Sequence, residues 1–436
     1  MRLLHILSQR PGRSGSGVFL KAMVREAAKR GYRQHAIVAG PPETSAAEVP
    51  PLTVEEVSLI TFPSPEAPFP VPGNSDVMPY PSTVFSGMTE TQVEQYLAAS
   101  RRVMEEVRER FRPDLVHTHH LWLMTSLARE VFADLPVVTT SHNAELRQLV
   151  KAPHLAPRVL PGIRRLDRIC VLTPRSVRDT LDAYGVAEER IALTGAGYDA
   201  ALFHPPSEPP EALREDLARR FGVHLPPGRL VTFVGRLSTP KGIPFLLAAA
   251  AEGGREGAPP FRLVLVGATG TGEDGRRMDE LVQAAGGLVT HLGAQPQEAV
   301  ARVLQLSDLF VLPSLFEGLP LTMLEAAACG CPCLVSGLPT IASWVPEEWT
   351  ARGWFELVPP LATTDADRPV EADVPRFVDA LAGALRRQLA RARRPEERTE
   401  LAGRLRGHSW SAVFERYEAV YGEVCGVTRG ASGPSR

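Results

Sequence analysis

Short apolar runs alternate with longer stretches of helical spacing along the first part of the chain. Residues 3–7 form the first run, a Gly-rich segment follows at 12–17, and residues 18–30 show the apolar spacing of a helix that stops at Gly31. Residues 35–38 form the second run. This order of strand, Gly-rich turn, helix and strand is typical of the opening of a nucleotide-binding α/β fold.

Three further predicted strands of the first half end in polar residues. They cover residues 114–120, 136–143 and 168–173; the first ends in two adjacent histidines and the second in Ser-His-Asn. Because the carboxyl ends of parallel strands meet at the same edge of a sheet, we expect a site along that edge.

Residues 41–82 interrupt this rhythm with frequent prolines. Proline fixes φ and lacks the backbone donor of a ladder, which excludes a central strand or a helix here. We therefore predict a long loop. Long ordered loops often carry function, but a surface excursion without a role explains the composition equally well.

The second half repeats the alternation after a Pro-rich linker near 204–210. A predicted strand at 229–234 leads into a Gly-rich turn and an Ala/Leu-rich helix, and further strands are predicted at 262–266, 289–293 and 308–312. A second series of strand–helix units indicates a second α/β domain, which a length of 436 residues also favours.

Composition excludes several classes of protein. The formal net charge of −2 gives no electrostatic basis for nucleic-acid binding. The five cysteines form no disulfide framework, and the Cys-Gly-Cys-Pro-Cys run at 329–333 lacks the partners of a zinc site. No apolar run approaches the roughly 18–20 residues of a membrane span, and the N-terminus does not read as a secretory signal. We expect a cytoplasmic protein.

Two acids, Glu317 and Glu325, enclose a Gly/Pro turn and the start of a predicted helix near Pro320. Free backbone N–H groups at a helix N-terminus bind phosphate, and carboxylates accept hydrogen bonds from sugar hydroxyls. Arg236 and Lys241 flank the Gly-rich turn of the same half, and both can reach a diphosphate. The half-chain thus combines cations, amides and acceptors suited to a nucleotide sugar.

Three segments resemble the retaining glycosyltransferases of family 4, which have the GT-B fold. Residues 233–242, Phe-Val-Gly-Arg-Leu-Ser-Thr-Pro-Lys-Gly, are close to the family's donor-diphosphate motif. Residues 317–325 match its E-x7-E motif, and residues 197–203 resemble the segment that ends its first domain. The resemblance covers nearly the whole chain. It is weaker over 41–95 and over 340–375, and in the second of these segments the family's Gly-Gly-x-x-Glu and Asn-Gly patterns are absent.

In the second half, the resemblance implies that Arg236 and Lys241 bind the donor diphosphate. Glu325 would hold the ribose, and Glu317 would face the donor sugar as one of two residues at the reacting centre. Further donor contacts would come from Gly318, Leu319, Pro320 and Leu321, and the base would meet the backbone of Leu292, Gly293 and Ala294.

In the first half, the resemblance implies that Gly15 and Gly17 lie beside the donor phosphate. His142 matches the family's histidine near the reacting sugar and is the second residue at the reacting centre. We place the acceptor against residues of the predicted loop and the strand ends: Asp76, Tyr80, His119, His120 and Asn143. A purely structural role for the two adjacent histidines stays open.

The resemblance further implies an α/β, GT-B fold with two Rossmann-like domains facing across a cleft. We expect an acceptor-binding domain over 1–205, a donor-binding domain over 206–409 and a last helix at 410–425 that crosses back to the first domain. Residues 428–436 are predicted to be a disordered tail.

The expected reaction is transfer of a sugar from a UDP- or GDP-linked donor to a small soluble acceptor, with retention of configuration and without a metal or other cofactor. A homodimer is left open. The alternatives are an S-glycosyltransferase acting on a small thiol, a lipid or polysaccharide glycosyltransferase, a GT-B epimerase or glycosyl phosphorylase, and an inactive scaffold.

Overall fold

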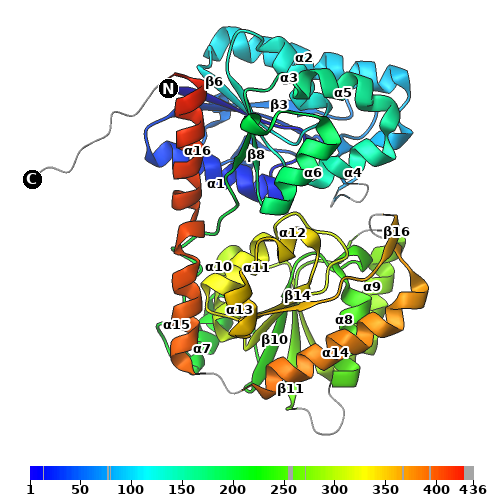
Figure 1. Cartoon of the computed structure of the whole chain (residues 1–436), viewed down its shortest axis with the longest axis vertical. Coiled ribbons are helices and arrows are strands. Elements are labelled where there is room, and N and C mark those ends of the chain that lie inside the picture. The colour runs from blue at the N-terminus through cyan, green and yellow to red at the C-terminus, as the bar shows by residue number, and fades with distance from the viewer. Residues whose placement is uncertain are drawn as a thin grey trace, which may run out of the picture. The chain divides into compact units, whose positions relative to one another are not determined.

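The computed structural model describes residues 1–12, 14–75, 78, 80–253, 259–270, 272–365, 368–391 and 394–426. The chain divides into two compact units, which can be followed by colour in Figure 1. Unit 1 comprises Met1–Ala196 and the C-terminal segment from Trp410, and unit 2 comprises Gly197–Ser409. The predicted tail at 428–436 lies outside the described residues.

The boundary between the units falls at Gly197, whereas the sequence placed it at 206. Segment 197–205 is held by unit 2, because the N–H of Tyr198 donates to the carbonyl of His408 at 3.1 Å and Gln305 Nε2 donates to the carbonyl of His204 at 3.0 Å. The last helix, α16 (Trp410–Val424), belongs to unit 1.

Unit 1 contains a seven-stranded parallel sheet in the order β3-β2-β1-β6-β7-β8-β9. The order reverses between β1 and β6, and such a switch point is where open α/β sheets bind ligands. The strands are β1 (Arg2–Leu7), β2 (Arg33–Gly40), β3 (Val57–Thr61), β6 (Leu115–His119), β7 (Val137–Thr140), β8 (Arg168–Val171) and β9 (Ile191–Leu193), with a separate short pair, β4 (Pro72–Gly73) and β5 (Thr83–Val84).

Both faces of this sheet are covered, because alternate residues of β2 enter two different apolar clusters. Ile37 and Ala39 pack into the larger cluster. Ala36 and Val38 pack with Leu20 of the first helix into the smaller one. The helices are α1 (Gly15–Lys29), α2 (Glu90–Phe111), α3 (Leu123–Val131), α4 (Ala144–Lys151), α5 (Ala156–Ile163), α6 (Pro174–Tyr184) and α16.

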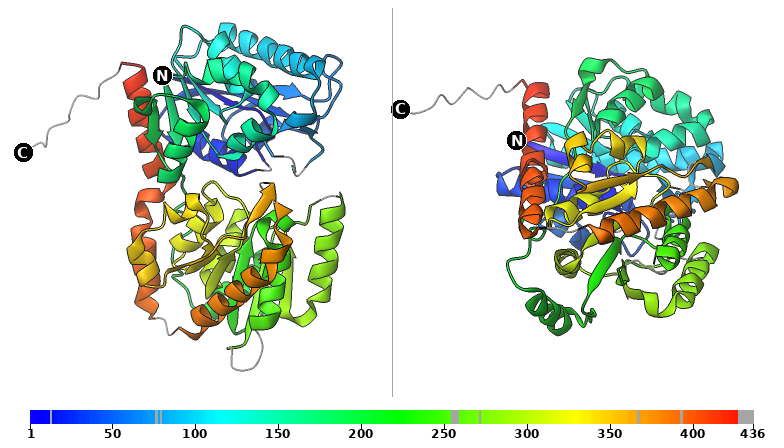
Figure 2. Two further views of the ribbon diagram at one scale, coloured as in Figure 1. Left: turned by 45° about the vertical axis from the view of Figure 1, so that its right-hand side comes forward. Right: turned by 60° about the horizontal axis from the view of Figure 1, so that its bottom comes forward.

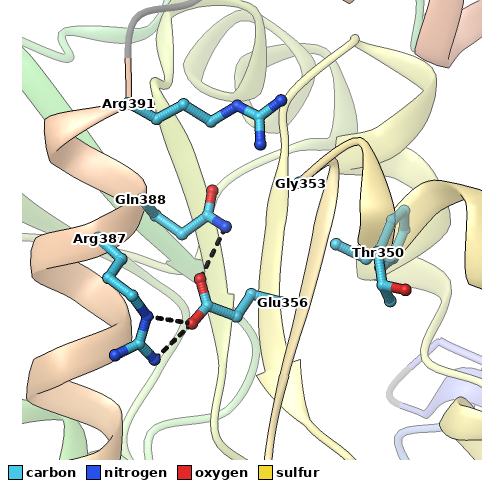
Figure 3. Close-up of a pocket in the computed structure, with 7 residues that line it drawn as sticks. Thr350, Gly353, Glu356, Arg387, Gln388 and Arg391 are labelled. Carbon is cyan, nitrogen blue, oxygen red and sulfur yellow. Dashed lines mark hydrogen bonds and ion pairs between the residues drawn. The ribbon is translucent and has the colours of Figure 1, made fainter.

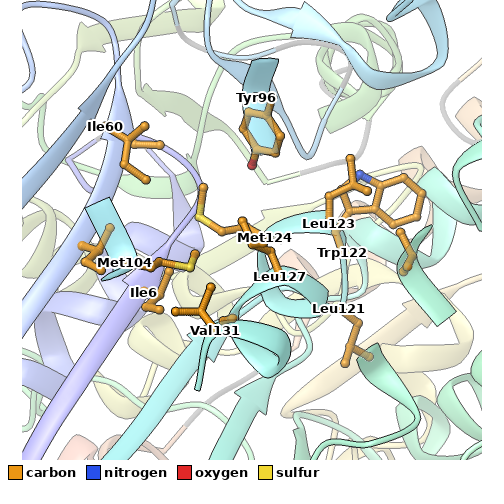
Figure 4. Packing of buried hydrophobic residues seen from close by; sticks show 14 of the residues in the cluster. Ile6, Ile60, Tyr96, Met104, Leu121, Trp122, Leu123, Met124, Leu127 and Val131 are labelled. Atoms are coloured by element: carbon orange, nitrogen blue, oxygen red, sulfur yellow. The ribbon is translucent and has the colours of Figure 1, made fainter. Parts of the chain in front are cut away.

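The larger cluster contains Tyr96 of α2, Trp122 before α3, and Ile6 of β1 (Figure 4). The Pro-rich segment also enters it with Phe62 and Phe69. The prediction of one long loop was therefore wrong in part, because the segment includes the edge strand β3, which pairs with β2 alone. The prolines of the segment from residue 63 onward follow this strand.

Unit 2 contains a six-stranded parallel sheet in the order β12-β11-β10-β13-β14-β15, with its switch point between β10 and β13. Figure 2 shows this unit, coloured from green through yellow to orange, from two further sides. Its elements are β10 (Arg229–Val234), β11 (Phe261–Val266), β12 (Val289–Gly293), β13 (Leu309–Leu312), β14 (Cys333–Ser336), β15 (Phe355–Val358), the hairpin β16 (Thr363–Asp365) and β17 (Arg368–Pro369), and the helices α7 (Pro210–Phe221), α8 (Ile243–Gly253), α9 (Gly272–Ala284), α10 (Gln297–Leu306), α11 (Leu321–Ala328), α12 (Pro339–Ala342), α13 (Glu347–Ala351), α14 (Val374–Ala390) and α15 (Pro395–Arg404).

The cysteine run 329–333 leads from α11 into β14. Its three cysteines are buried and none of them forms a disulfide, which agrees with a core role. Within the described part of the chain, no helix combines the length and apolar character that a membrane crossing requires.

Candidate active site

Lys241 and Glu317 meet at the switch point of the unit 2 sheet. Lys241 follows β10 and ends the 3-10 turn Thr239–Lys241, whereas Glu317 follows the neighbouring strand β13. Lys241 Nζ donates to Glu317 Oε1 at 2.6 Å, and Ser314 Oγ donates to the same oxygen at 2.7 Å. Two donors therefore hold one oxygen of this carboxylate in place.

The backbone brings these two side chains together. The N–H of Leu315 donates to the carbonyl of Pro240 at 2.9 Å, which ties the loop after β13 to the loop after β10. Gly242 has a φ of +77°, and a Cβ there would overlap the carbonyl of Pro313. Glycine is required at this position both by the left-handed backbone and by the close approach of the second loop.

Arg236 lies between Gly235 and the turn that carries Lys241. Burial lowers the pKa of its guanidinium, and the carboxylates of Asp274 and Glu317 oppose that shift. Asp274 itself accepts a hydrogen bond from Thr239 Oγ1 at 2.7 Å. The two predicted cations and Glu317 thus gather at one edge of the unit 2 sheet.

Helix α11 begins at Leu321 with no side-chain cap. Pro320 has no backbone N–H, so of the predicted segment only Gly318, Leu319 and Leu321 carry amides that can reach an anion. Glu325 lies in the middle of this helix and is only 7% exposed. Burial raises its pKa to about 7, and the charge of Asp199 adds to the effect.

The segment predicted to meet the base follows β12. The carbonyl of Leu292 accepts from Gln295 Nε2 at 2.6 Å, and the carbonyl of Gly293 accepts from the N–H of Gly267 at 2.8 Å. These bonds fix the backbone beside the carboxyl end of β11. A base contact by Leu292, Gly293 or Ala294 stays a prediction.

In unit 1, His119 ends β6, His142 follows the neighbouring strand β7, and the two side chains contact each other. His119 Nδ1 lies 3.1 Å from His142 Nε2, and the rings stack with centroids 5.4 Å apart. His120 and Asn143 both have left-handed backbones, with φ values of +70° and +69°. Such a conformation in a non-glycine residue stores strain and is often found at functional sites.

Glu145 in the first turn of α4 was missed by the sequence reasoning. It is fully buried, accepts from the N–H of His142 at 2.9 Å and lies 3.1 Å from His120 Nδ1. Burial alone would raise its pKa, but the hydrogen bond and charge of His120 outweigh this and lower it to about 2. An acid in the first turn of a helix that follows a strand-end histidine was the available signal.

His119 and His120 are 2% and 3% exposed, so their contacts here are with His142 and Glu145. Their predicted contact with an acceptor stays a prediction. Asn143 is also buried, and its Oδ1 has no hydrogen-bond partner within the described part of the chain.

Gly15 and Gly17 lie inside the first turn of α1, not in a loop before it. Ser14 is the N-cap, and its Oγ accepts from the N–H of Gly17 at 3.1 Å. A Cβ on Gly17 would overlap the carbonyl of Pro11, whereas Gly15 faces open space. The amide of Gly17 is therefore already occupied, and Gly17 is required for packing.

The predicted acceptor residues of the Pro-rich segment have different outcomes. Asp76 lies outside the described residues. Tyr80 is 6% exposed, and its hydroxyl oxygen accepts from the N–H of Arg10 at 3.2 Å. Asn74 of the same segment is buried and donates to Ser8 Oγ at 3.0 Å. It thereby ties this segment to the end of β1.

A separate pocket of about 350 Å³ lies where α14 meets β15 (Figure 3). Glu356 in this pocket is bound by Arg387 at 2.6 Å and by Gln388 at 2.8 Å. Phe355, which also lines it, is the first residue of β15. The pocket therefore opens at the amino ends of the strands, away from the switch-point edge.

Solved structures with the same fold cover nearly the whole chain. Sucrose-phosphate synthase of Thermosynechococcus elongatus superposes with a TM-score of 0.63 at 20% identity, over 98% of this chain and all of that one. Anabaena HepE in complex with UDP and glucose superposes with a TM-score of 0.64 at 16% identity, over 97% of this chain and all of that one. The fold is that of GT-B glycosyltransferases, as the sequence predicted.

Sequence relatives agree with this class. The model of Glycosyltransferase Family 4 matches residues 13–202, and that of Glycosyl transferases group 1 matches residues 218–352. The chain belongs to this family of glycosyltransferases.

Several relatives carry the name D-inositol 3-phosphate glycosyltransferase. The protein of Segniliparus rotundus is 31% identical over 297 residues, which cover 62% of this chain and 64% of the relative. That of Nocardia farcinica is 29% identical over 337 residues, covering 73% and 69%. That of Mycobacterium tuberculosis is 32% identical over 258 residues, covering 54% and 50%. The alignments thus span between half and about two thirds of the relatives' lengths.

Proposed function

We propose that this protein transfers a sugar from a nucleoside-diphosphate sugar to a hydroxyl of a small polar acceptor, with retention of configuration. The observation that carries the proposal is the Lys241–Glu317 pair at the switch point of unit 2. The pair combines a cation, which suits a diphosphate, with a carboxylate, which suits sugar hydroxyls, and it lies at the edge where such sheets bind ligands.

The chemistry of the leaving group explains the cations. Breaking the bond to the sugar leaves charge on the diphosphate, and preorganised cations and helix N-termini stabilise such charge. Lys241, Arg236 and the start of α11 supply these groups from the chain itself. We therefore propose that the diphosphate needs no metal ion.

Glu317 and Glu325 have different proposed roles. Glu317 Oε2 has no hydrogen-bond partner within the described part of the chain, whereas its Oε1 is held by Lys241 and Ser314. One oxygen is thus fixed while the other can accept from a donor sugar. Glu325 is buried in a helix whose other residues, apart from Thr322, are apolar, and ribose hydroxyls would satisfy its carboxylate.

The names of the relatives suggest the first acceptor to test. Those proteins are named for inositol 3-phosphate, a small phosphorylated polyol. We propose an acceptor of this class, in which a hydroxyl attacks the sugar on the face that the diphosphate leaves. Its proton passes to the leaving phosphate. In this reaction His142 binds a substrate hydroxyl and does not act as a nucleophile.

The experiment combines a donor panel with paired variants. The full chain is incubated with UDP-, GDP- and ADP-sugars, with and without inositol phosphates, and products are followed by chromatography. Lys241→Ala should lower kcat/KM about 100-fold, as expected for loss of one group that stabilises developing charge. Glu317→Ala should also lower it.

The matched control is the Arg387–Glu356 pair, which has the same 2.6 Å separation elsewhere in unit 2. Arg387→Ala should retain normal turnover. Equal turnover of Lys241→Ala and the wild type would contradict the site assignment. An epimerised donor without acceptor, or a sugar phosphate formed from inorganic phosphate, would indicate a different reaction of the same fold.

A further inference from the structure

Five buried or half-buried imidazoles form a continuous group behind the carboxyl ends of β1, β6 and β7. Ring centroids are separated by 6.0 Å for His5–His117, 4.8 Å for His117–His119, 5.4 Å for His119–His142 and 4.8 Å for His120–His142. Three buried ring nitrogens in this group have no hydrogen-bond partner within the described part of the chain: His5 Nδ1, His119 Nε2 and His120 Nε2. A neutral imidazole carries one proton, so the hydrogen bonds decide which nitrogens are donors.

The tautomer of His5 follows from Gln34. Gln34 Nε2 donates to the carbonyl of Val24 at 3.0 Å, so its Oε1 must face His5. His5 Nε2 lies 3.0 Å from that oxygen and therefore donates to it. The remaining nitrogen, His5 Nδ1, is a buried lone pair.

Both nitrogens of His117 and the Nδ1 of His120 already have partners, so none of the three is available to His5 or His119. His117 Nδ1 lies 2.7 Å from the hydroxyl of Tyr421, and its Nε2 lies 2.8 Å from Thr140 Oγ1, so both of its nitrogens are occupied. His120 Nδ1 donates to the carboxylate of Glu145.

His119 then has two possible arrangements. A ring nitrogen of His5, of His117 and of His119 all lie within 4.8 Å of one another, and those of His117 are occupied. With its proton on Nε2, His119 has an N–H dipole that is attracted to the nearby lone pair of His5, although the two nitrogens do not form a direct hydrogen bond. With its proton on Nδ1, it presents a second lone pair to the first, which is unfavourable in a dry interior.

In the favourable arrangement, His119 Nδ1 is a lone pair and must accept from His142 Nε2 at 3.1 Å. The proton of His142 is then on Nε2. The Nδ1 of His142 has no hydrogen-bond partner within the described part of the chain. It is also not one of the buried atoms that lack a partner, and His142 is only half-buried, so this nitrogen is exposed at the surface of unit 1.

We propose that Gln34, His5 and His119 are positioning residues that hold His142 with its proton on Nε2, so that the outward Nδ1 accepts a hydrogen bond from a substrate hydroxyl. The substrate contact rests on the proposed function, whereas the tautomer is a property of the unliganded protein. Burial and the neighbouring His120 lower the pKa of His142 to about 3, so the ring is neutral near pH 7.

The test is the ¹⁵N spectrum of the ring nitrogens in the full chain labelled with ¹⁵N-histidine at pH 7. The His142 signals are assigned by their loss in His142→Gln. We expect Nε2 of His142 to have the shift and attached proton of a donor, and Nδ1 to have the shift of a bare acceptor. Removing the His5 lone pair by His5→Phe should move both signals toward a mixture of tautomers.

His35→Gln is the matched control. His35 follows Gln34 on the same strand but bonds to Ser58 instead, so its loss should leave the His142 signals in place. A protonated Nδ1 on His142 in the wild type would overturn the proposal whether or not the variants fold. If His142 carries its proton on Nδ1 and a stoichiometric metal ion is bound, His5 and His119 would instead be ligands of that ion. The predicted tautomer without sugar transfer would contradict the proposed function and leave this inference intact.

Discussion

Glu325 offers a direct test of ribose binding, because its carboxyl should lose a proton when the donor binds. Its pKa is raised to about 7 in the unliganded structure, against an ordinary value of about 4.3. At about 1.4 kcal/mol per unit, ionising this group costs roughly 3–4 kcal/mol more than in water. At pH 6 the acid is therefore mostly protonated.

Hydrogen bonds from ribose hydroxyls favour the charged carboxylate and lower its pKa. If the bound pKa falls to about 5 or below, binding at pH 6 releases about 0.8 of a proton. The release should shrink toward zero at pH 8, where the unliganded carboxyl is already ionised. Donor affinity should accordingly rise between pH 6 and pH 8.

The assay is isothermal titration calorimetry in buffers of different ionisation enthalpy. The ligand should be a UDP-sugar, because the terminal phosphate of free UDP titrates near pH 6 and would add its own proton. The slope of the observed enthalpy against the buffer enthalpy gives the number of protons released. Asp199→Asn should reduce that number, because the charge of Asp199 contributes to the raised pKa.

Glu325→Gln should abolish the release, whereas Glu356→Gln, which lies in the separate pocket of unit 2, should leave it unchanged. If the observed enthalpy of the wild type does not depend on the buffer, donor binding releases no proton and Glu325 does not bind the ribose in the way proposed. An unchanged release in Glu325→Gln would contradict the role of Glu325 as well.

Three further predictions concern unit 1. Burial lowers the pKa of His5 to about 4, so below about pH 6.5 the unfolded chain binds more protons than the folded chain. The free energy of unfolding should therefore fall by about 1.4 kcal/mol per pH unit from this group as the pH drops toward 4. A flat profile of denaturant midpoints against pH would contradict this prediction. Gly17→Ala should lower the free energy of unfolding by about 1–3 kcal/mol, because the added Cβ overlaps the backbone. Gly15 faces open space, so Gly15→Ala should unfold at the wild-type midpoint or slightly above it. Equal losses of stability in the two variants would contradict the packing role of Gly17. Glu145→Ala leaves two buried donors without an acceptor, the backbone N–H of His142 and the ring of His120. The free energy of urea unfolding should therefore fall by about 2–5 kcal/mol. A loss below about 1 kcal/mol would contradict this prediction.

Local patterns were sufficient to predict the central strands. The runs at 3–7 and 229–234 are short, apolar and followed by Gly-rich turns, and they correspond to β1 and β10. The edge strand β3 was not predicted, because its five residues lie within a Pro-rich segment and only its pairing with β2 defines it. Pairing between distant segments is not visible in a local pattern.

The unit 2 residues of the site could be predicted because they follow neighbouring strands. Arg236, Lys241 and Glu317 gather at the switch point, since the parallel order brings the ends of β10 and β13 together. The support of His142 could not be predicted in the same way. The role of Glu145 depends on the turn between β7 and α4, and that of His5 depends on the orientation of one buried amide.

The stereochemistry of the product shows directly whether the protein transfers a sugar with retention of configuration. The full chain is incubated with an α-linked nucleotide sugar and a small polyol phosphate, and the anomeric configuration of the new linkage is read by ¹H NMR. We predict an α-linked product whose formation slows about 100-fold in Lys241→Ala and not in Arg387→Ala. A β-linked product, or equal rates in the two variants, would contradict it.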